Sequence, residues 1–162
     1  MQTNDELLKK LSDAGIELVV IGGVAAVLHG SATATRDLDL CVPFTPESFA
    51  RILPVLRELH ARFRVHPDQP PLTGEPERFV PFRHLLLVTD LGWLDLLREV
   101  AGVGGWREVV AASETMDIAG APVRVLTLEA LVRAKRATGR DRDLRALPEL
   151  EALLDLQRQP DH

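Results

Sequence analysis

The chain has 162 residues, of which 46% are apolar and 27% charged, a balance typical of a globular protein with a real core. We therefore expect a single domain spanning residues 1–162. The formal net charge of −5 argues against broad nonspecific nucleic-acid binding, which depends on clustered positive charge, although it leaves room for a local basic patch.

Signals for membranes, export and disulfides are missing from the sequence. The longest apolar run, residues 18–28, is about half the roughly 20 residues that a membrane helix needs, and Gly22-Gly23 interrupts it. The N-terminus has no basic segment followed by an apolar stretch, so no signal peptide is visible. A single cysteine, Cys41, excludes an internal disulfide framework. We expect a cytoplasmic protein with no membrane partner.

The first third of the chain predicts alternating helices and strands. Apolar residues recur at helical spacing before Gly15, and a β-branched run follows at 17–21. Thr45-Pro46 is a helix start, with a capping hydroxyl and proline at the first helical position. Pro54 should kink or divide that helix. The expected order is a helix ending at Gly15, a strand at 17–21, a helix at 24–28 closed by 29–31, a strand at 37–42 and a helix from Pro46.

The remainder begins with a proline-rich segment, residues 66–81, which holds five of the eleven prolines and predicts a long irregular loop. Strands are expected at 85–88 and 93–97, and again at 116–118 and 123–126. A C-terminal helical segment spans 127–157, with a helix from Thr127 to near Gly139 and a restart at Pro148. This order predicts an α/β (α+β) fold in which helices flank a mixed β-sheet, with further helices at the C-terminus.

Asp37-Leu38-Asp39 is the pattern most suggestive of chemistry. Side chains alternate across a strand, so both carboxylates face the same side, with their Cα atoms roughly 7 Å apart. Neighbouring carboxylates repel each other unless a cation lies between them, and an all-oxygen donor set suits Mg²⁺. On this pattern alone, two solvent-facing aspartates at a strand end are the more ordinary explanation.

The Ile21-Gly22-Gly23 segment ends a strand and opens a helix. Glycine lets the backbone approach a ligand, and helix N-terminal amides can bind phosphate oxygens. The segment is not a dinucleotide fingerprint, because the third glycine is missing. A haloacid-dehalogenase-type site also fits poorly, because Cys41 stands where that pattern has threonine.

Taken together, Ile21-Gly22-Gly23 and Asp37-Leu38-Asp39-Leu40 resemble the motif of the DNA polymerase β-like nucleotidyltransferase superfamily. The resemblance implies a nucleotidyltransferase fold with a third carboxylate on a neighbouring strand. Asp95, between leucines in mid-strand, is the preferred choice. Asp90 precedes Leu91-Gly92 and fits turn chemistry better, and a site with neither remains open.

Further segments resemble bacterial minimal nucleotidyltransferases related to abortive-infection (type IV toxin–antitoxin) toxins. In that group a helical lysine contacts nucleotide phosphates and is followed by arginine and aspartate. The sequence departs from the pattern of that group at Thr33, where relatives carry arginine. The matching segments are Gly22-Gly23, His29-Gly30-Ser31, residues 35–39 and residues 131–140, and the lysine, arginine and aspartate match Lys135, Arg140 and Asp143.

Simpler explanations exist for several of these residues. Lys135 and the surrounding arginines could form a solvated basic face. His29 and Ser31 could either touch a phosphate or cap a helix end. Arg36 should point away from Asp37 if the strand has already begun.

The resemblance implies a Mg²⁺-dependent nucleotidyltransferase that moves a nucleoside monophosphate from a nucleoside triphosphate to a hydroxyl. The acceptor would be an RNA end or a protein, as for toxin-like relatives, and a cognate antitoxin could be a partner. The alternatives are an enzyme that modifies a small molecule and a non-catalytic nucleotide-binding regulator. The resemblance implies that one or two Mg²⁺ ions bind to Asp37, Asp39 and Asp95, and that Asp95 acts as the base. These three residues and Lys135 would be catalytic. The nucleotide would be bound by Gly22, Gly23, Ser31, Lys135 and Arg140.

Overall fold

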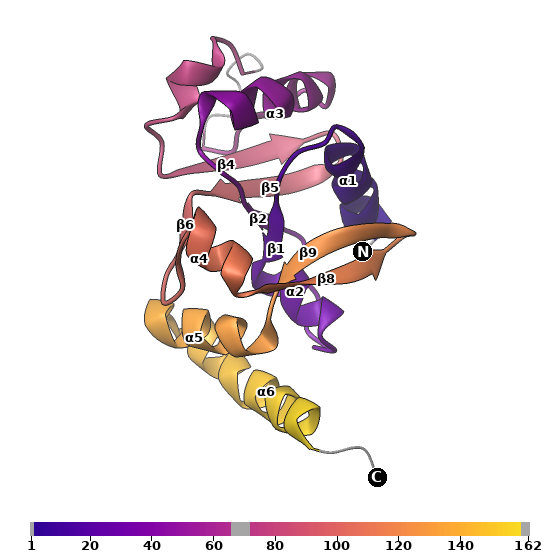
Figure 1. The fold of residues 1–162 in the computed structure, drawn as a ribbon, viewed down its shortest axis with the longest axis vertical. Coiled ribbons are helices and arrows are strands. Elements are labelled where there is room, and N and C mark those ends of the chain that lie inside the picture. The colour runs from indigo at the N-terminus through magenta and orange to yellow at the C-terminus, as the bar shows by residue number, and fades with distance from the viewer. Residues whose placement is uncertain (1, 66–71, 160–162) are drawn as a thin grey trace.

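A computed structural model describes residues 2–65 and 72–159, and its ribbon is shown in Figure 1. A seven-stranded mixed sheet forms the centre, in the order β3-β4-β5-β2-β1-β9-β8, and β6 and β7 form a separate two-stranded pair. The elements are α1 (Gln2–Asp13), β1 (Val19–Ile21), α2 (Gly22–Leu28), β2 (Leu38–Cys41), α3 (Pro46–Glu58), β3 (Arg62–Phe63), the 3₁₀ helix η1 (Pro76–Phe79), β4 (His84–Thr89), β5 (Gly92–Leu97), β6 (Glu99–Val100), β7 (Gly104–Gly105), α4 (Trp106–Ala111), β8 (Ser113–Ile118), β9 (Ala121–Leu126), α5 (Leu128–Thr138) and α6 (Asp141–Arg158).

The sheet is mixed, as the sequence predicts. β2 runs antiparallel to β1 and parallel to β5, while β1 runs parallel to β9. The central strands β1 and β2 are short. β1 is wholly apolar and buried, whereas β2 buries Leu38, Leu40 and Cys41 and leaves Asp39 partly exposed. The sheet therefore brings strands that lie far apart in the chain next to β2.

Helix boundaries follow the predicted capping residues. The Thr45 hydroxyl accepts a hydrogen bond from the Ser48 amide, and the Thr127 hydroxyl accepts one from the Ala130 amide. Gly139 ends α5 in the left-handed conformation. These predictions depend on local chemistry, and the structure confirms them.

The predicted restart at Pro148 is wrong, and Pro54 does not divide its helix. Pro54 lies within α3 and Pro148 within α6, and each helix continues through its proline. Both prolines are exposed, as are Ala50 and Leu144, the residues four positions before them. Because the carbonyls left without an amide partner lie on the solvent side, water can bond to them and the helix need not end.

The proline-rich segment is only partly described, because residues 66–71 lie outside the described part of the chain. Its second half is more ordered than the predicted irregular loop: it contains η1, and Leu72 and Phe79 are buried in the core. The β6–β7 pair and α4 were not predicted, since their residues carry only a short, broken apolar pattern around the buried Val109.

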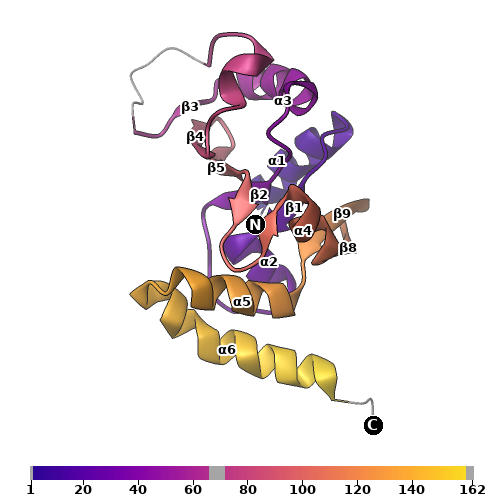
Figure 2. The ribbon, with the colours of Figure 1, turned by 60° about the vertical axis from the view of Figure 1, so that its left-hand side comes forward.

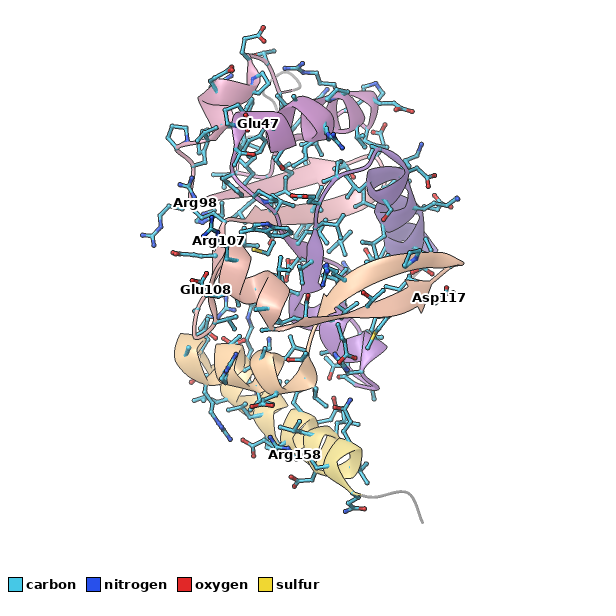
Figure 3. The ribbon with its side chains drawn as sticks, viewed as in Figure 1. Glu47, Arg98, Arg107, Glu108, Asp117 and Arg158 are labelled. Carbon is cyan, nitrogen blue, oxygen red and sulfur yellow. The ribbon has the colours of Figure 1, made fainter. Side chains whose placement is uncertain are left out.

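Helices α5 and α6 pack on each other at one end of the molecule, and α2 lies between them and the central strands (Figures 1 and 2). Arg158 near the end of α6 (Figure 3) reaches Glu129 of α5 at 3.9 Å. Within residues 2–65 and 72–159, no helix has the length and apolarity to cross a membrane.

Candidate active site

The sheet places Asp39 of β2 directly opposite Asp95 of β5 in a parallel ladder. Leu38 and Leu40 point into the core, and the two strands alternate in register, so both carboxylates lie on the other, partly open face. Asp37 immediately precedes β2 and is also partly buried. The carboxylates at 37, 39 and 95 therefore gather at one place, which we call the acidic wall.

Asp90, the alternative to Asp95, lies elsewhere. Its carboxylate is 2.6 Å from the His60 ring nitrogen, and its amide donates to the Leu59 carbonyl in the turn between β4 and β5. The geometry thus favours Asp95 over Asp90 as the third carboxylate.

Asp39 is strongly perturbed by its surroundings. Burial, together with repulsion from Asp95 and Asp37, raises the pKa of Asp39 to about 7, and the positive charge of Lys135 offsets this only in part. An additional cation beside Asp39 would offset much of the free-energy cost of keeping this carboxylate charged.

Gly22 is required by this crowding. A Cβ atom at position 22 would lie 2.3 Å from Asp39 Oδ2, and the backbone there has a φ of +65°. A Cβ at Gly23 would lie 2.8 Å from Thr35 Oγ1. The glycine pair therefore lets the start of α2 approach the acidic wall. The N-cap residue, Ile21, has no side-chain acceptor, so its own side chain leaves the first α2 amides uncapped.

Arg64 is a site residue that sequence reasoning missed. Its Nη1 donates to Asp95 Oδ1 at 2.8 Å and its Nη2 to Asp95 Oδ2 at 3.4 Å. The guanidinium also lies over the Trp93 ring, 4.6 Å from the centroid. Arg64 follows a two-residue strand next to the proline-rich segment, and no local sequence pattern links it to β5.

The side chains of the acidic wall have suitable donor atoms for a metal ion, but they are not arranged around one. In the described part of the chain, no group of three or more His, Cys, Asp or Glu side chains is arranged to hold a metal ion. The donor set at positions 37, 39 and 95 nonetheless consists of hard oxygens. Burial, together with repulsion from Asp95 and Asp37, disfavours the charged form of Asp39 unless a cation lies beside it. These residues fit Mg²⁺ once the Asp95 oxygens are released from Arg64.

A second cluster, the basic wall, lies on α5 and α6. Asp143 is fully buried, and its two oxygens meet Lys135 Nζ at 3.1 Å and Arg140 Nε at 2.7 Å. Burial alone would raise the pKa of Asp143, but hydrogen bonds from Arg140, Thr138 and Lys135 hold that pKa well below its usual range. Lys135 is only 23% exposed, so it is not part of a simple solvated face.

The loop after α2 has its own partners. Ser31 Oγ donates to the Glu149 carboxylate of α6, so the hydroxyl predicted to face phosphate is bound to an anion of the chain itself. His29 Nε2 lies 2.8 Å from the Leu126 carbonyl and ties the end of α2 to β9. Arg36 is exposed. Glu149 could not have been predicted, because it lies 118 residues from Ser31.

Asp37 and Asp39 of the acidic wall and the three residues of the basic wall line one pocket of about 1000 Å³, while Asp95, opposite Asp39 on β5, lies outside its lining. Gly22, Gly23, Asp37 and Asp39 border it from the sheet, and Lys135, Arg140 and Asp143 border it from the helices. A pocket with carboxylates on one side and cations on the other suits a metal-bound polyphosphate.

No family model matches the sequence, and no curated protein matches it. Solved structures do. The antibiotic-resistance factor ANT(2'')-Ia superposes with a TM-score of 0.57 at 18% identity, over 97% of this chain and 92% of that one. The chain has a nucleotidyltransferase fold.

Other solved structures agree on this fold. A protein from Thermotoga maritima described as a nucleotidyltransferase gives a TM-score of 0.53 at 19% identity, over 89% of each chain. ANT(2'')-Ia in complex with adenylyl-2''-tobramycin gives 0.55 at 18% identity, over 93% of this chain and 94% of that one. At these identities the likeness concerns the fold, and the chemistry has to be argued from the site.

Proposed function

We propose that this protein is a Mg²⁺-dependent nucleotidyltransferase that moves a nucleoside monophosphate from a nucleoside triphosphate to a hydroxyl group. The observation that carries the proposal is the register of β2 and β5, which sets Asp39 opposite Asp95. Asp39 and the neighbouring Asp37 line a pocket together with Lys135. The nucleotidyltransferase fold supports the same conclusion.

Asp37, Asp39 and Asp95 would hold the Mg²⁺, in one or two ions. When bound, the metal would offset phosphate charge and lower the pKa of the attacking hydroxyl. The crowding that raises the pKa of Asp39 is the reason for expecting a cation there.

The chain's own residues account for the remaining steps. The acceptor oxygen forms a bond to the α-phosphorus as the bond to the bridging oxygen of pyrophosphate breaks. Asp95 is the base that takes the proton from the attacking hydroxyl. Lys135 and Arg140, together with the first amides of α2 at Gly22 and Gly23, bind the phosphates and offset their charge.

The sequence and the structure indicate less about the acceptor than about the nucleotide donor. A toxin-like role, with an RNA end or a protein hydroxyl as acceptor and a cognate antitoxin as partner, rests on the sequence motif alone. A small-molecule acceptor has two observations in its favour. One is a pocket of about 1000 Å³, large for a single small ligand. The other is the similarity to ANT(2'')-Ia, a structure solved with adenylyl-2''-tobramycin.

The test is incubation of the protein and Mg²⁺ with each of four α-³²P-labelled nucleoside triphosphates. Parallel reactions contain total RNA, cell-lysate protein or a panel of aminoglycosides. We expect label to move to one acceptor class in wild type and not in the Asp37→Asn, Asp39→Asn double variant. Mg²⁺-dependent nucleotide binding with no transfer to any acceptor would instead support the non-catalytic regulator.

A further inference from the structure

Arg64 is the one cation whose side chain is shown bonded to the acidic wall in the described part of the chain. It donates to both oxygens of Asp95, at 2.8 and 3.4 Å. Lys135, the other positive charge acting on Asp39, is bonded instead to Asp143 at 3.1 Å. The negative charge of the acidic wall is thus compensated directly by a single guanidinium.

The position of Arg64 is well defined by its surroundings. Its backbone amide donates to the Leu86 carbonyl at 2.9 Å, which extends the pairing of β3 with β4 by one residue. Leu86 lies opposite Asp95 on β5, so this pairing brings Arg64 within reach of the carboxylate. The guanidinium packs on Trp93, two residues before Asp95 on the same face of β5, and its side chain is 23% exposed.

A guanidinium in this position resembles a bound cation in two respects. Its planar fork matches the two carboxylate oxygens, and it brings a positive charge that arginine cannot lose near neutral pH. Both features oppose a metal ion, because the donors occupy Asp95 oxygens and the charge repels a second cation.

We propose that Arg64 is a positioning residue that holds the Asp95 carboxylate in the metal-free protein and competes with Mg²⁺ for it. The inference rests on the proposed function, since it assumes that Asp95 is a metal ligand. Binding of Mg²⁺ then draws Asp95 away from the guanidinium and changes the surroundings of Trp93.

The first experiment compares Mg²⁺ affinities by isothermal titration calorimetry at pH 8, with no nucleotide present. Arg64→Gln removes the charge, so we expect it to bind Mg²⁺ about tenfold more tightly than wild type, given partial screening by water and salt. The matched control is Arg83→Gln. Arg83 lines the pocket that Asp37 and Asp39 border, and it pairs with Glu99 at 2.8 Å, with 80% of its side chain exposed. The control should stay within about twofold of wild type, because an exposed charge is screened.

The second experiment uses Trp93 fluorescence and leaves Arg64 in place. Trp93 and Trp106 are the only tryptophans, so each can be removed in turn. We expect a Mg²⁺-dependent change in emission in wild type and in Trp106→Phe, and its loss in Trp93→Phe and in Arg64→Gln.

The outcomes separate the inference from the proposed function. If wild type binds Mg²⁺ but Arg64→Gln binds it equally well or more weakly, Arg64 does not compete and the inference is overturned while the proposed function stands. Mg²⁺ binding that leaves Trp93 emission unchanged overturns it as well. If neither wild type nor Arg64→Gln binds Mg²⁺, with or without a nucleoside triphosphate, the proposed function itself fails.

Discussion

The acidic wall, through Asp37 and Asp39, and the basic wall border the same pocket but balance their charges in opposite ways. For the three carboxylates of the acidic wall, residues 2–65 and 72–159 supply one directly bonded cation, Arg64 at Asp95. In the basic wall one buried carboxylate, Asp143, is bonded to both Lys135 and Arg140. The acidic wall therefore has an excess of negative charge that favours an added cation. The basic wall is a completed ion cluster with positive charge left over for an anion.

The largest effect is expected from Asp39→Asn in the acidic wall. Nucleotidyl transfer should fall on the order of a thousandfold, because a metal ligand is lost. The metal-free protein should become more stable, since repulsion of Asp39 by Asp37 and Asp95 disappears. Label transfer and thermal unfolding measure the two effects. Asp90→Asn is the matched control: it should retain transfer, and a comparable loss there would show that the third carboxylate was assigned wrongly.

Gly22→Ala tests how tightly the start of α2 packs on the acidic wall. The added methyl would lie 2.3 Å from Asp39 Oδ2 at a φ of +65°. We expect the free energy of unfolding to fall by about 3 kcal/mol, from backbone strain and displacement of the carboxylate together. Gly120→Ala, at a φ of +84° with no atom within 4 Å of the new Cβ, isolates the strain. Its loss should be about 1 kcal/mol by denaturant titration. Equal losses in the two variants would contradict the proposed crowding.

Asp143→Asn probes the basic wall and should have the opposite pattern to Asp39→Asn. Removing the buried charge leaves the mostly buried Lys135 without its anionic partner, which should cost about 2 kcal/mol of stability, allowing for the exposure of Arg140. Mg²⁺ affinity should remain near that of wild type, while the affinity for nucleoside triphosphate falls. Calorimetry with each ligand measures both. A loss of Mg²⁺ binding would mean that the two walls are not independent.

The smallest effect is the pH dependence of the metal-free protein. Asp39 has a pKa of about 7 when folded and an ordinary value of 3.8, so between these values the folded state holds a proton that the unfolded state has released. Stability should therefore fall as pH rises from about 4 to 7, by on the order of 1 kcal/mol after allowance for the partial exposure of Asp39. Unfolding midpoints in urea across this range should show the slope in wild type. Asp39→Asn should lack it, and an unchanged slope would assign the effect to another group.

Much of the fold was predictable because its signals are local. Thr45, Thr127 and Gly139 act on the residues next to them, so their roles as caps are the same in any tertiary context. The alternation of Leu38 and Leu40 with Asp39 likewise shows which side of a strand is buried. The predictions that helices divide or restart at Pro54 and Pro148 failed, because the free-energy cost of a proline inside a helix depends on whether the carbonyl that loses its amide partner faces water.

The sequence by itself indicated the six longest strands of the sheet, the helix caps and the placement of Asp37 and Asp39 on one face, since each follows from spacing within a few residues. Only the tertiary structure decided that Asp95 lies beside Asp39, that Ser31 is bound to Glu149, and that Arg64 holds Asp95. These contacts join residues 31 to 118 positions apart, and the strand order of the sheet is what brings Asp95 beside Asp39. Opposite charges compensate each other when they are close in space, whatever their distance in the sequence. The cation bound to the acidic wall could therefore be identified only from the folded structure.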